Sequence, residues 1–195
     1  MQFVLEPGPA AILFWIVTLG WLSEALWLPS RRGAETDPDG ASERRAIVAA
    51  IMGGLLWTAL CHGLGWGNLE GRASAVMRTC GLALYTSGLV LRYWSALVLG
   101  RRFTRDVHVG HDQALACSGP YRLLRHPLYV GLLCLGTGLL LLFANLAGPA
   151  LGFPMLAIAI RRRVRREERL LRSTLEAGSY ERWCRHRLRL IPGFF

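Results

Sequence analysis

A long run of uncharged, mostly apolar residues between two arginine clusters constrains this chain most. No Asp, Glu, Lys or Arg occurs between Arg125 and Arg161. As one helix this run of about 35 residues would measure roughly 52 Å, which is too long for a single crossing of a ~30 Å hydrocarbon core. Asn145, Gly148 and Pro149 interrupt the pattern near its middle. The sequence therefore predicts a helical hairpin with a tight outer turn.

Both ends of this predicted hairpin are rich in arginine. Cytoplasmic loops of membrane proteins carry an excess of positive charge, so we expect both ends on the cytoplasmic face of a membrane. The segment Arg125-His126-Pro127 and the acidic pair Glu167-Glu168 would then lie close together at one surface.

The composition agrees with a membrane protein. Of 195 residues, 52% are hydrophobic, and the 23 basic residues, all arginine, exceed the 13 acidic ones. Such a chain is too apolar for an ordinary soluble domain. No recognised nucleic-acid motif accompanies the positive charge, so we expect no nucleic acid as a partner. The five cysteines contain no CxxC pair and predict neither a disulfide framework nor a zinc site.

Three apolar segments of membrane length precede the hairpin. We expect helices at residues 10–28, 46–66 and 75–100, with the N-terminus outside. The first segment is expected to be retained, because no basic region of a cleavable signal comes before it. The loop from Pro29 to Arg45 is expected to be a cytoplasmic connection.

The predicted fold class is all-α. We expect a polytopic membrane protein with about five transmembrane helices, including the C-terminal hairpin, plus a cytoplasmic amphipathic helix from Arg161 to Ala177 that Gly178 ends. No internal repeat indicates a second domain. Residues 1–195 are therefore predicted to form one domain, in which residues 1–100 are a three-helix scaffold and residues 101–195 carry the functional site.

The amphipathic helix places its acids unusually. At 100° per residue, Glu168 shares one stripe with four apolar residues, and Glu167 sits at its edge. The apolar members of this stripe are Ile160, Val164, Leu171 and Leu175. An acid among apolar side chains costs free energy unless it meets a cation or a donor, so both acids are expected to face something polar. Pairing of Glu167 with Arg163, one turn earlier, is the structural alternative.

Other polar residues in apolar surroundings have plain explanations beside functional ones. Arg92 either snorkels to the inner interface or takes part in a site. His62 has no partner at metal-ligand spacing. The His108 and His111 pair lacks a clear third and fourth ligand, so we predict no metal.

Three separated motifs occur in the second half of the chain. The pattern GxYxxxRHPxYxG is met by Gly119, Tyr121, Arg125, His126, Pro127, Tyr129 and Gly131. RxxxEE is met by Arg163, Glu167 and Glu168, and a glycine and tyrosine followed by LIP are met by Gly178, Tyr180, Leu190, Ile191 and Pro192. In this order the motifs resemble the isoprenylcysteine carboxyl methyltransferase family and its phospholipid N-methyltransferase relatives. Members of that family are integral membrane enzymes that use S-adenosylmethionine.

The resemblance implies a cofactor site at the cytoplasmic side. Together with the residue types, it predicts that S-adenosylmethionine is bound by Gln113, Ala114, Leu115, Ala116, Tyr121, His126, Pro127, Leu128, Tyr129, Gly131, Glu167 and Glu168. It implies that Arg163 meets the methyl acceptor, and it predicts Arg125, Arg163 and Glu167 as catalytic. The chain departs from the family at Gln113, where many members have histidine, and at Trp183, where tyrosine is usual.

The residue types suit methyl transfer. This reaction mainly needs alignment of acceptor and methyl group and exclusion of water. The donor's ammonium, carboxylate, ribose and adenine call for an acid, cationic donors and aromatic walls, which the predicted set contains. The planar fork of Arg163 is suited to an anionic acceptor such as a carboxylate. Pro127 would fix the backbone at the corner that Arg125, His126 and Pro127 form before the hairpin, and Gly131 would allow close backbone approach.

Other functions remain open at this stage. Among methyltransferases, carboxyl methylation of a lipid-linked or small hydrophobic acid leads, and N-methylation of a phospholipid or S-methylation of a thiol is the alternative. A membrane reductase that uses NADPH is a second class, because sterol reductases resemble this family in their C-terminal part. A non-enzymatic scaffold that is only oriented by its arginines is a third. The expected partners are a lipid-like acceptor and membrane lipids.

Overall fold

The structure is a computed structural model that describes residues 8–27, 38–100, 115–175 and 178–190. Its long helices are α2 (Pro9–Trp27), α3 (Pro38–Gly63), α4 (Gly71–Leu99), α5 (Pro127–Leu141) and α6 (Ala147–Thr174). A 3₁₀ turn, η2 (Gly119–Arg122), and a short helix, α7 (Ser179–Cys184), complete the fold. The described residues contain no β-strand, only isolated bridges. The all-α prediction is therefore confirmed.

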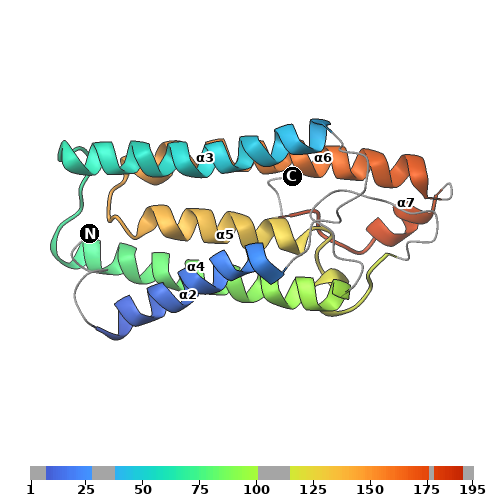
Figure 1. The fold of residues 1–195 in the computed structure, drawn as a ribbon, viewed down its shortest axis with the longest axis horizontal. Helices are drawn as coiled ribbons and strands as arrows, with labels where there is room; N and C mark the ends of the chain where they lie inside the picture. Colours follow the sequence, from blue (N-terminus) through green and yellow to red (C-terminus); the bar gives the residue numbers. More distant parts are fainter. Residues whose placement is uncertain (1–7, 28–37, 101–114, 176–177, 191–195) are drawn as a thin grey trace.

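The helices run along the long axis of the molecule, with α5 between α4 and α6 (Figure 1). The main pairings are α4 with α5 and α3 with α6. Glycines allow the first pairing, because a Cβ on Gly88 would lie 2.7 Å from the Gly131 carbonyl and a Cβ on Gly131 would lie 2.8 Å from the Gly88 carbonyl. Small residues at helix contacts are usual in membrane proteins. The close approach predicted at Gly131 is confirmed.

Many large apolar side chains lie on the outer surface of the bundle rather than in its core. Exposed examples on three helices are Ile16, Leu19, Leu56, Leu60, Val90 and Leu97. Ala41–Gly63 and Gly71–Leu99 are long and apolar enough to cross a membrane, and Pro9–Ser23 and Pro127–Leu141 are shorter apolar helices. An apolar outer surface of this kind suits contact with lipid. The total of about five spans stays a prediction.

The hairpin turn is built around Asn145, whose side chain is fully buried. Its Nδ2 donates to the Trp66 carbonyl at 2.5 Å and to Asn68 Oδ1 at 2.7 Å, and its Oδ1 accepts from the Gly148 amide at 3.0 Å. These bonds supply partners for an amide in an otherwise apolar region. They also fix the turn to the loop between α3 and α4, so the predicted break in the apolar run is a specified turn.

Both predicted boundaries of the amphipathic helix are wrong. We expected the hairpin's second arm and an amphipathic helix from Arg161 to Ala177 as separate elements, but α6 continues without a break from Ala147 and ends at Thr174. Arginine and glutamate are good helix formers, so the change from apolar to charged residues does not interrupt the backbone. Gly178, at φ 79°, precedes α7 instead of ending the amphipathic helix.

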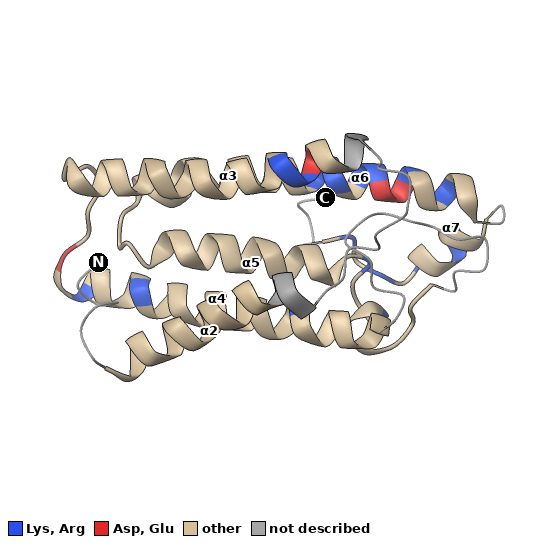
Figure 2. Cartoon of the chain, in the orientation of Figure 1, with Lys and Arg blue, Asp and Glu red and all other residues tan. Residues whose placement is uncertain are grey.

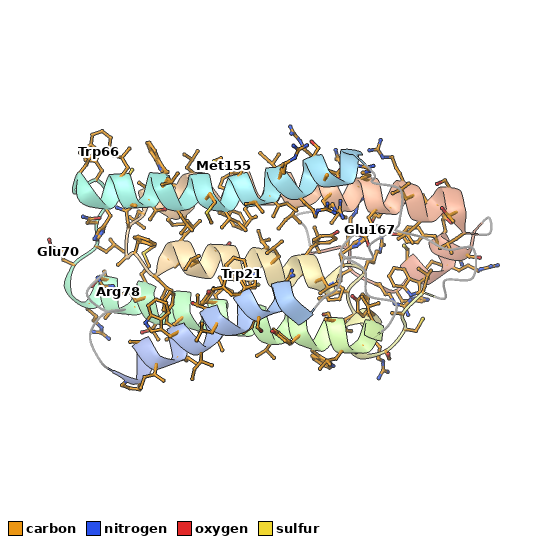
Figure 3. All side chains as sticks on the ribbon, viewed as in Figure 1. Trp21, Trp66, Glu70, Arg78, Met155 and Glu167 are labelled. Carbon is orange, nitrogen blue, oxygen red and sulfur yellow. The ribbon has the colours of Figure 1, made fainter. Side chains whose placement is uncertain are left out.

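The helix expected at residues 46–66 begins earlier, at Pro38. Glu43, Arg44 and Arg45 therefore lie on the first turns of α3 and not in a loop. Figure 2 shows the basic and acidic residues of these turns beside the charged half of α6, at one end of the bundle. In Figure 3, Glu167 lies in this charged half, whereas Glu70 and Trp66 lie at the opposite end.

Candidate active site

Glu168 is the most deeply buried acid of the charged end, at 1% exposure. Arg189, from the tail after α7, donates from Nε to Glu168 Oε1 at 2.8 Å and from Nη2 to Oε2. His126 Nε2 lies 3.3 Å from Oε1. Burial alone would raise the pKa of Glu168, but the hydrogen bonds from His126 and Arg189 lower it to about 2. Glu168 is thus a buried, ionised anchor whose charge is matched.

Glu167, its neighbour, is more open, with 26% of its side chain exposed. Its Oε1 lies 3.9 Å from His126 Nδ1, so the imidazole stands between the two acids. Burial and the charge of Glu167 raise the pKa of Tyr121, on η2. The predicted meeting of the His126 corner with the acidic pair across the hairpin is therefore confirmed.

Arg163 lies one turn before these acids and is 3% exposed. Its Nε donates to the Tyr129 hydroxyl at 3.2 Å, and its Nη1 donates to Glu43 Oε2 at 3.3 Å. Burial alone would lower the pKa of Arg163, but the Tyr129 hydroxyl and the neighbouring carboxylates raise it. Arg163 therefore stays charged, and Glu43 of α3 contacts it in addition to any pairing with Glu167.

Arg125 holds the C-terminal tail. Its Nε donates to the Arg187 carbonyl at 2.9 Å, its Nη2 donates to the Cys184 carbonyl at 3.1 Å, and its backbone amide donates to the Leu188 carbonyl at 2.7 Å. Arg125 Nη1 lies only at the limit of contact with Glu168, at 4.0 Å. These bonds give the predicted catalytic residue a positioning role, because they bring the tail and Arg189 to the acids.

The tail also reaches the segment before η2. Trp183 Nε1 donates to the Ala116 carbonyl at 2.9 Å, and Arg187 Nε donates to the Tyr121 carbonyl at 2.7 Å. The Arg187 guanidinium lies 4.8 Å from the Trp183 ring centroid. Leu115 and Ala116 are half-buried beside this contact. The other two predicted cofactor residues of the segment, Gln113 and Ala114, lie outside the described residues, as do His108 and His111.

The corner itself is formed by the start of α5. Pro127 occupies the first turn of the helix, as predicted from its fixed φ. Arg92, from α4, donates from Nη1 to the Leu128 carbonyl at 3.1 Å. The Tyr129 ring lies 5.9 Å from the His126 ring. Arg92 thus binds the backbone at the corner, a contact that snorkelling to the interface does not explain.

Comparison with known proteins gives this arrangement a family. The sequence profile of the phospholipid methyltransferase family matches residues 76–177, which include α5, the corner and the charged half of α6. The chain belongs to the phospholipid methyltransferase family. It is a membrane methyltransferase, as the three motifs predict.

A solved relative shares the fold of this family member. The structure of the eukaryotic intramembrane Ras methyltransferase ICMT (isoprenylcysteine carboxyl methyltransferase) aligns with a TM-score of 0.64. The alignment covers 98% of this chain and 70% of that chain, at 20% sequence identity. No match was found among curated proteins.

The residues of this phospholipid methyltransferase family member suit the methyl donor that the motifs imply. Glu167 is a partly open carboxylate of the kind that an ammonium group needs, and His126 and Tyr121 lie near it. The Tyr180 hydroxyl lies close to this cluster, and burial and the charge of Glu168 raise its pKa. The residues of this cluster therefore fit S-adenosylmethionine.

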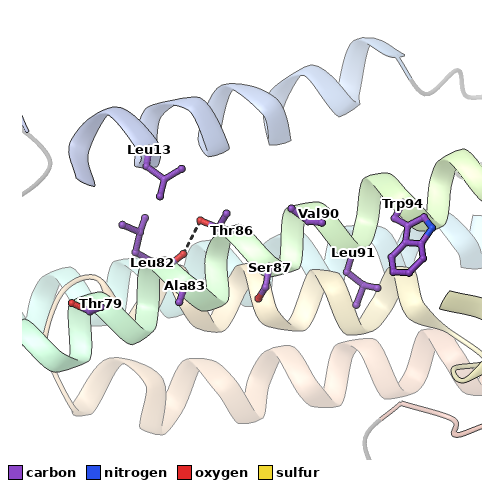
Figure 4. A pocket seen from close by; sticks show the side chains of 9 residues that line it. All are labelled: Leu13, Thr79, Leu82, Ala83, Thr86, Ser87, Val90, Leu91 and Trp94. Atoms are coloured by element: carbon purple, nitrogen blue, oxygen red, sulfur yellow. Dashed lines mark hydrogen bonds between the residues drawn. The ribbon is translucent and has the colours of Figure 1, made fainter. Parts of the chain in front are cut away.

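An apolar groove of about 670 Å³ lies elsewhere, along α4, and one residue of α2 also lines it (Figure 4). Its lining is Leu13, Thr79, Leu82, Ala83, Thr86, Ser87, Val90, Leu91 and Trp94. None of these side chains is charged, and none belongs to the cluster of Glu167, Glu168 and His126. We therefore assign no chemistry to the groove.

Three residues of this site are absent from the sequence prediction: Glu43, Arg187 and Arg189. The signal for Arg189 was present, because it directly precedes Leu190-Ile191-Pro192, which the third motif matches. Glu43 had no comparable signal, since it falls in a segment that was predicted to be a loop.

Proposed function

We propose that this membrane methyltransferase transfers the methyl group of S-adenosylmethionine to the carboxylate of a lipid-like or small hydrophobic acid at the cytoplasmic face. The observation that carries the proposal is that one charged cluster contains both a partly open carboxylate and a buried arginine. Glu167 lies beside His126, and Arg163 lies across Tyr129 with Glu43 as its carboxylate partner. The first pair suits the cationic donor and the second suits an anionic acceptor.

On the donor side, the proposal gives the cofactor ammonium to Glu167 rather than Glu168. Both Glu168 oxygens already accept hydrogen bonds from Arg189, and His126 lies against one of them. Glu168 therefore has little remaining capacity for a ligand. The remaining cofactor contacts predicted from the motifs, from Gln113 to Ala116 and from Tyr121 to Gly131, are retained in this proposal.

On the acceptor side, a carboxylate needs no base. S-adenosylmethionine supplies an electrophilic methyl group on a sulfonium, and a carboxylate oxygen is already deprotonated at neutral pH. The protein then has to bind and orient the carboxylate and keep water away from it. Arg163 is buried, charged and forked, and so matches this task.

A second candidate is methylation of an amine, as in N-methylation of an aminophospholipid. The observation that favours it is Glu43, because a carboxylate beside Arg163 could bind an ammonium group. The excess of arginine there favours the anionic acceptor, since Arg166 Nη1 also lies 3.8 Å from the same Glu43 oxygen.

Transfer of tritium from methyl-labelled S-adenosylmethionine tests the proposal. The purified protein in nanodiscs is offered an isoprenylated cysteine, phosphatidylethanolamine or a simple thiol. A carboxyl ester releases its label as methanol in mild alkali, whereas an N-methyl amine or a thioether keeps it. We expect an alkali-labile product from the isoprenylated cysteine. A product that is stable to alkali, or binding of NADPH in place of S-adenosylmethionine, would overturn the proposal.

A further inference from the structure

Glu43 reaches the charged cluster from the scaffold half of the chain. It lies on the first turns of α3, and its Oε2 lies 3.3 Å from Arg163 Nη1 and 3.8 Å from Arg166 Nη1. The Glu43 side chain is 19% exposed and that of Arg163 is 4% exposed. This contact joins two segments that are far apart in sequence, and it is partly shielded from water.

The contact uses the chemistry that an acceptor carboxylate would use. Arg163 presents Nε to the Tyr129 hydroxyl and Nη1 to Glu43. A carboxylate on the outer end of a guanidinium is the usual partner of arginine, whether it comes from a side chain or from a ligand. An incoming acid that binds Nη1 of Arg163 must therefore share this nitrogen with Glu43 or displace Glu43 from it.

An internal carboxylate at this position has a selective effect. Two guanidinium groups at a membrane surface would attract the anionic headgroups of bulk lipids. A built-in counter-ion weakens the attraction for every anion, so only one with further contacts in the site binds well. Specific binding often depends on a repulsive element of this kind.

We infer that Glu43 is a specificity-determining residue, whose carboxylate competes with the acceptor for Arg163 and Arg166. The inference rests on the proposed carboxylate acceptor. It adds a residue that lies outside the three motifs and outside the matched segment of residues 76–177.

Binding of two matched probes tests the inference. Decanoate and decylamine, each at a concentration below micelle formation, are titrated calorimetrically into protein in nanodiscs, and empty nanodiscs are subtracted. Glu43→Gln keeps the size of the side chain and removes its charge. We expect it to bind decanoate about tenfold more tightly than the wild type, a gain of about 1.4 kcal/mol. Glu43→Asp, which restores the charge, should bind decanoate like the wild type.

The control is Glu70→Gln, an equal change of charge at an exposed acid at the opposite end of the molecule, and it should leave decanoate binding unchanged. Unchanged or weaker decanoate binding by Glu43→Gln would overturn the inference. So would a selective loss of decylamine binding by Glu43→Gln, which would make Glu43 a site for a cation.

Two further measurements distinguish failure of the inference from a folding defect of the variant and from failure of the proposed function. If Glu43→Gln does not fold, Arg166→Gln tests whether Arg166 is one of the cations for which Glu43 and the acceptor compete. With one cation fewer, decanoate binding should weaken about tenfold. Unchanged binding in that variant would contradict the competition. A further outcome is that the wild type transfers tritium to an alkali-labile product while Glu43→Gln binds decanoate like the wild type. That result would reject the specificity role of Glu43 and leave the proposed function standing.

Discussion

Arg189 holds both carboxylate oxygens of Glu168, and this pair closes the tail of the chain onto the charged half of α6. Glu168 and Glu167 are adjacent in sequence but differ in environment. The first is covered and saturated with donors, and the second is partly open beside His126. Two neighbouring acids thus have different expected roles, and exchanging each for its amide separates them.

Glu168→Gln is expected to destabilise the protein. It leaves Arg189 and His126 facing an amide, and breaking a buried charge pair costs about 3–5 kcal/mol. The change in free energy of unfolding is measured by denaturant titration in detergent micelles. The isosteric Glu167→Gln serves as control, and equal stability of the two variants would contradict the anchoring role.

The pH dependence of stability should follow from the same carboxylate. Its pKa in the folded protein is about 2, below the ordinary value of 4.5. Because folding lowers the pKa, the charge contributes fully above about pH 4.5, and this contribution is lost as the pH falls from there toward 2. The unfolding temperature of the wild type should therefore fall more steeply over this range than that of Glu168→Gln. Parallel curves for the two proteins would show that Glu168 is not the responsible group.

Glu167→Gln is expected to weaken binding of S-adenosylmethionine by roughly 10- to 100-fold, because a hydrogen bond to a charged group contributes about 1.5–3 kcal/mol. Calorimetry on the purified protein measures the affinity. Glu181→Gln, which neutralises an exposed acid on α7, is the control and should bind normally. Unchanged affinity in Glu167→Gln would remove this acid from the cofactor site.

Arg163→Ala is expected to raise the KM for a carboxylate acceptor by at least about tenfold, through loss of a buried charged hydrogen bond. Its affinity for S-adenosylmethionine should stay close to that of the wild type. The neighbouring exposed Arg162→Ala is the matched control. Full turnover of the native acceptor by Arg163→Ala would exclude a carboxylate clamp at this residue.

Arg125→Lys is expected to loosen the tail even though it keeps the positive charge. One ammonium group cannot reproduce the fork that binds the carbonyls of Cys184 and Arg187 together. Hydrogen exchange at residues 184–190 should therefore become faster, while Arg122→Lys, at an exposed arginine of η2, leaves it unchanged. Equal protection from exchange in both variants would show that Arg125 does not hold the tail in place.

The sequence predicts well both the hairpin and the closeness of its two charged ends, because both depend on where the charged residues lie. An uncharged run bounded by arginines has few arrangements in a membrane, and Asn145 offers a polar group for one turn. The meeting of His126 with Glu167 follows from that geometry. The buried position of Glu168 follows from the helical spacing of Ile160 and Val164, which are also buried.

The features that the sequence did not predict depend on tertiary contacts or on where a helix begins. The change from apolar to charged residues near Arg161 is a change of surroundings, not of backbone, so it does not divide α6. The helix α3 begins at Pro38, a residue type that is common in a first helical turn, and this start brings Glu43 to Arg163. The division of roles between Glu167 and Glu168 depends on Arg189, whose partner no local pattern specifies.

The unbroken course of α6 has a mechanical consequence. Pro154 lies inside the apolar half of the helix, and the charged half that follows it contains no further proline. Arg163 and Glu168 both lie in this charged half, so their spacing is fixed by the helix backbone. Any tilt or shift of α6 therefore displaces the buried arginine and the buried acid by the same movement.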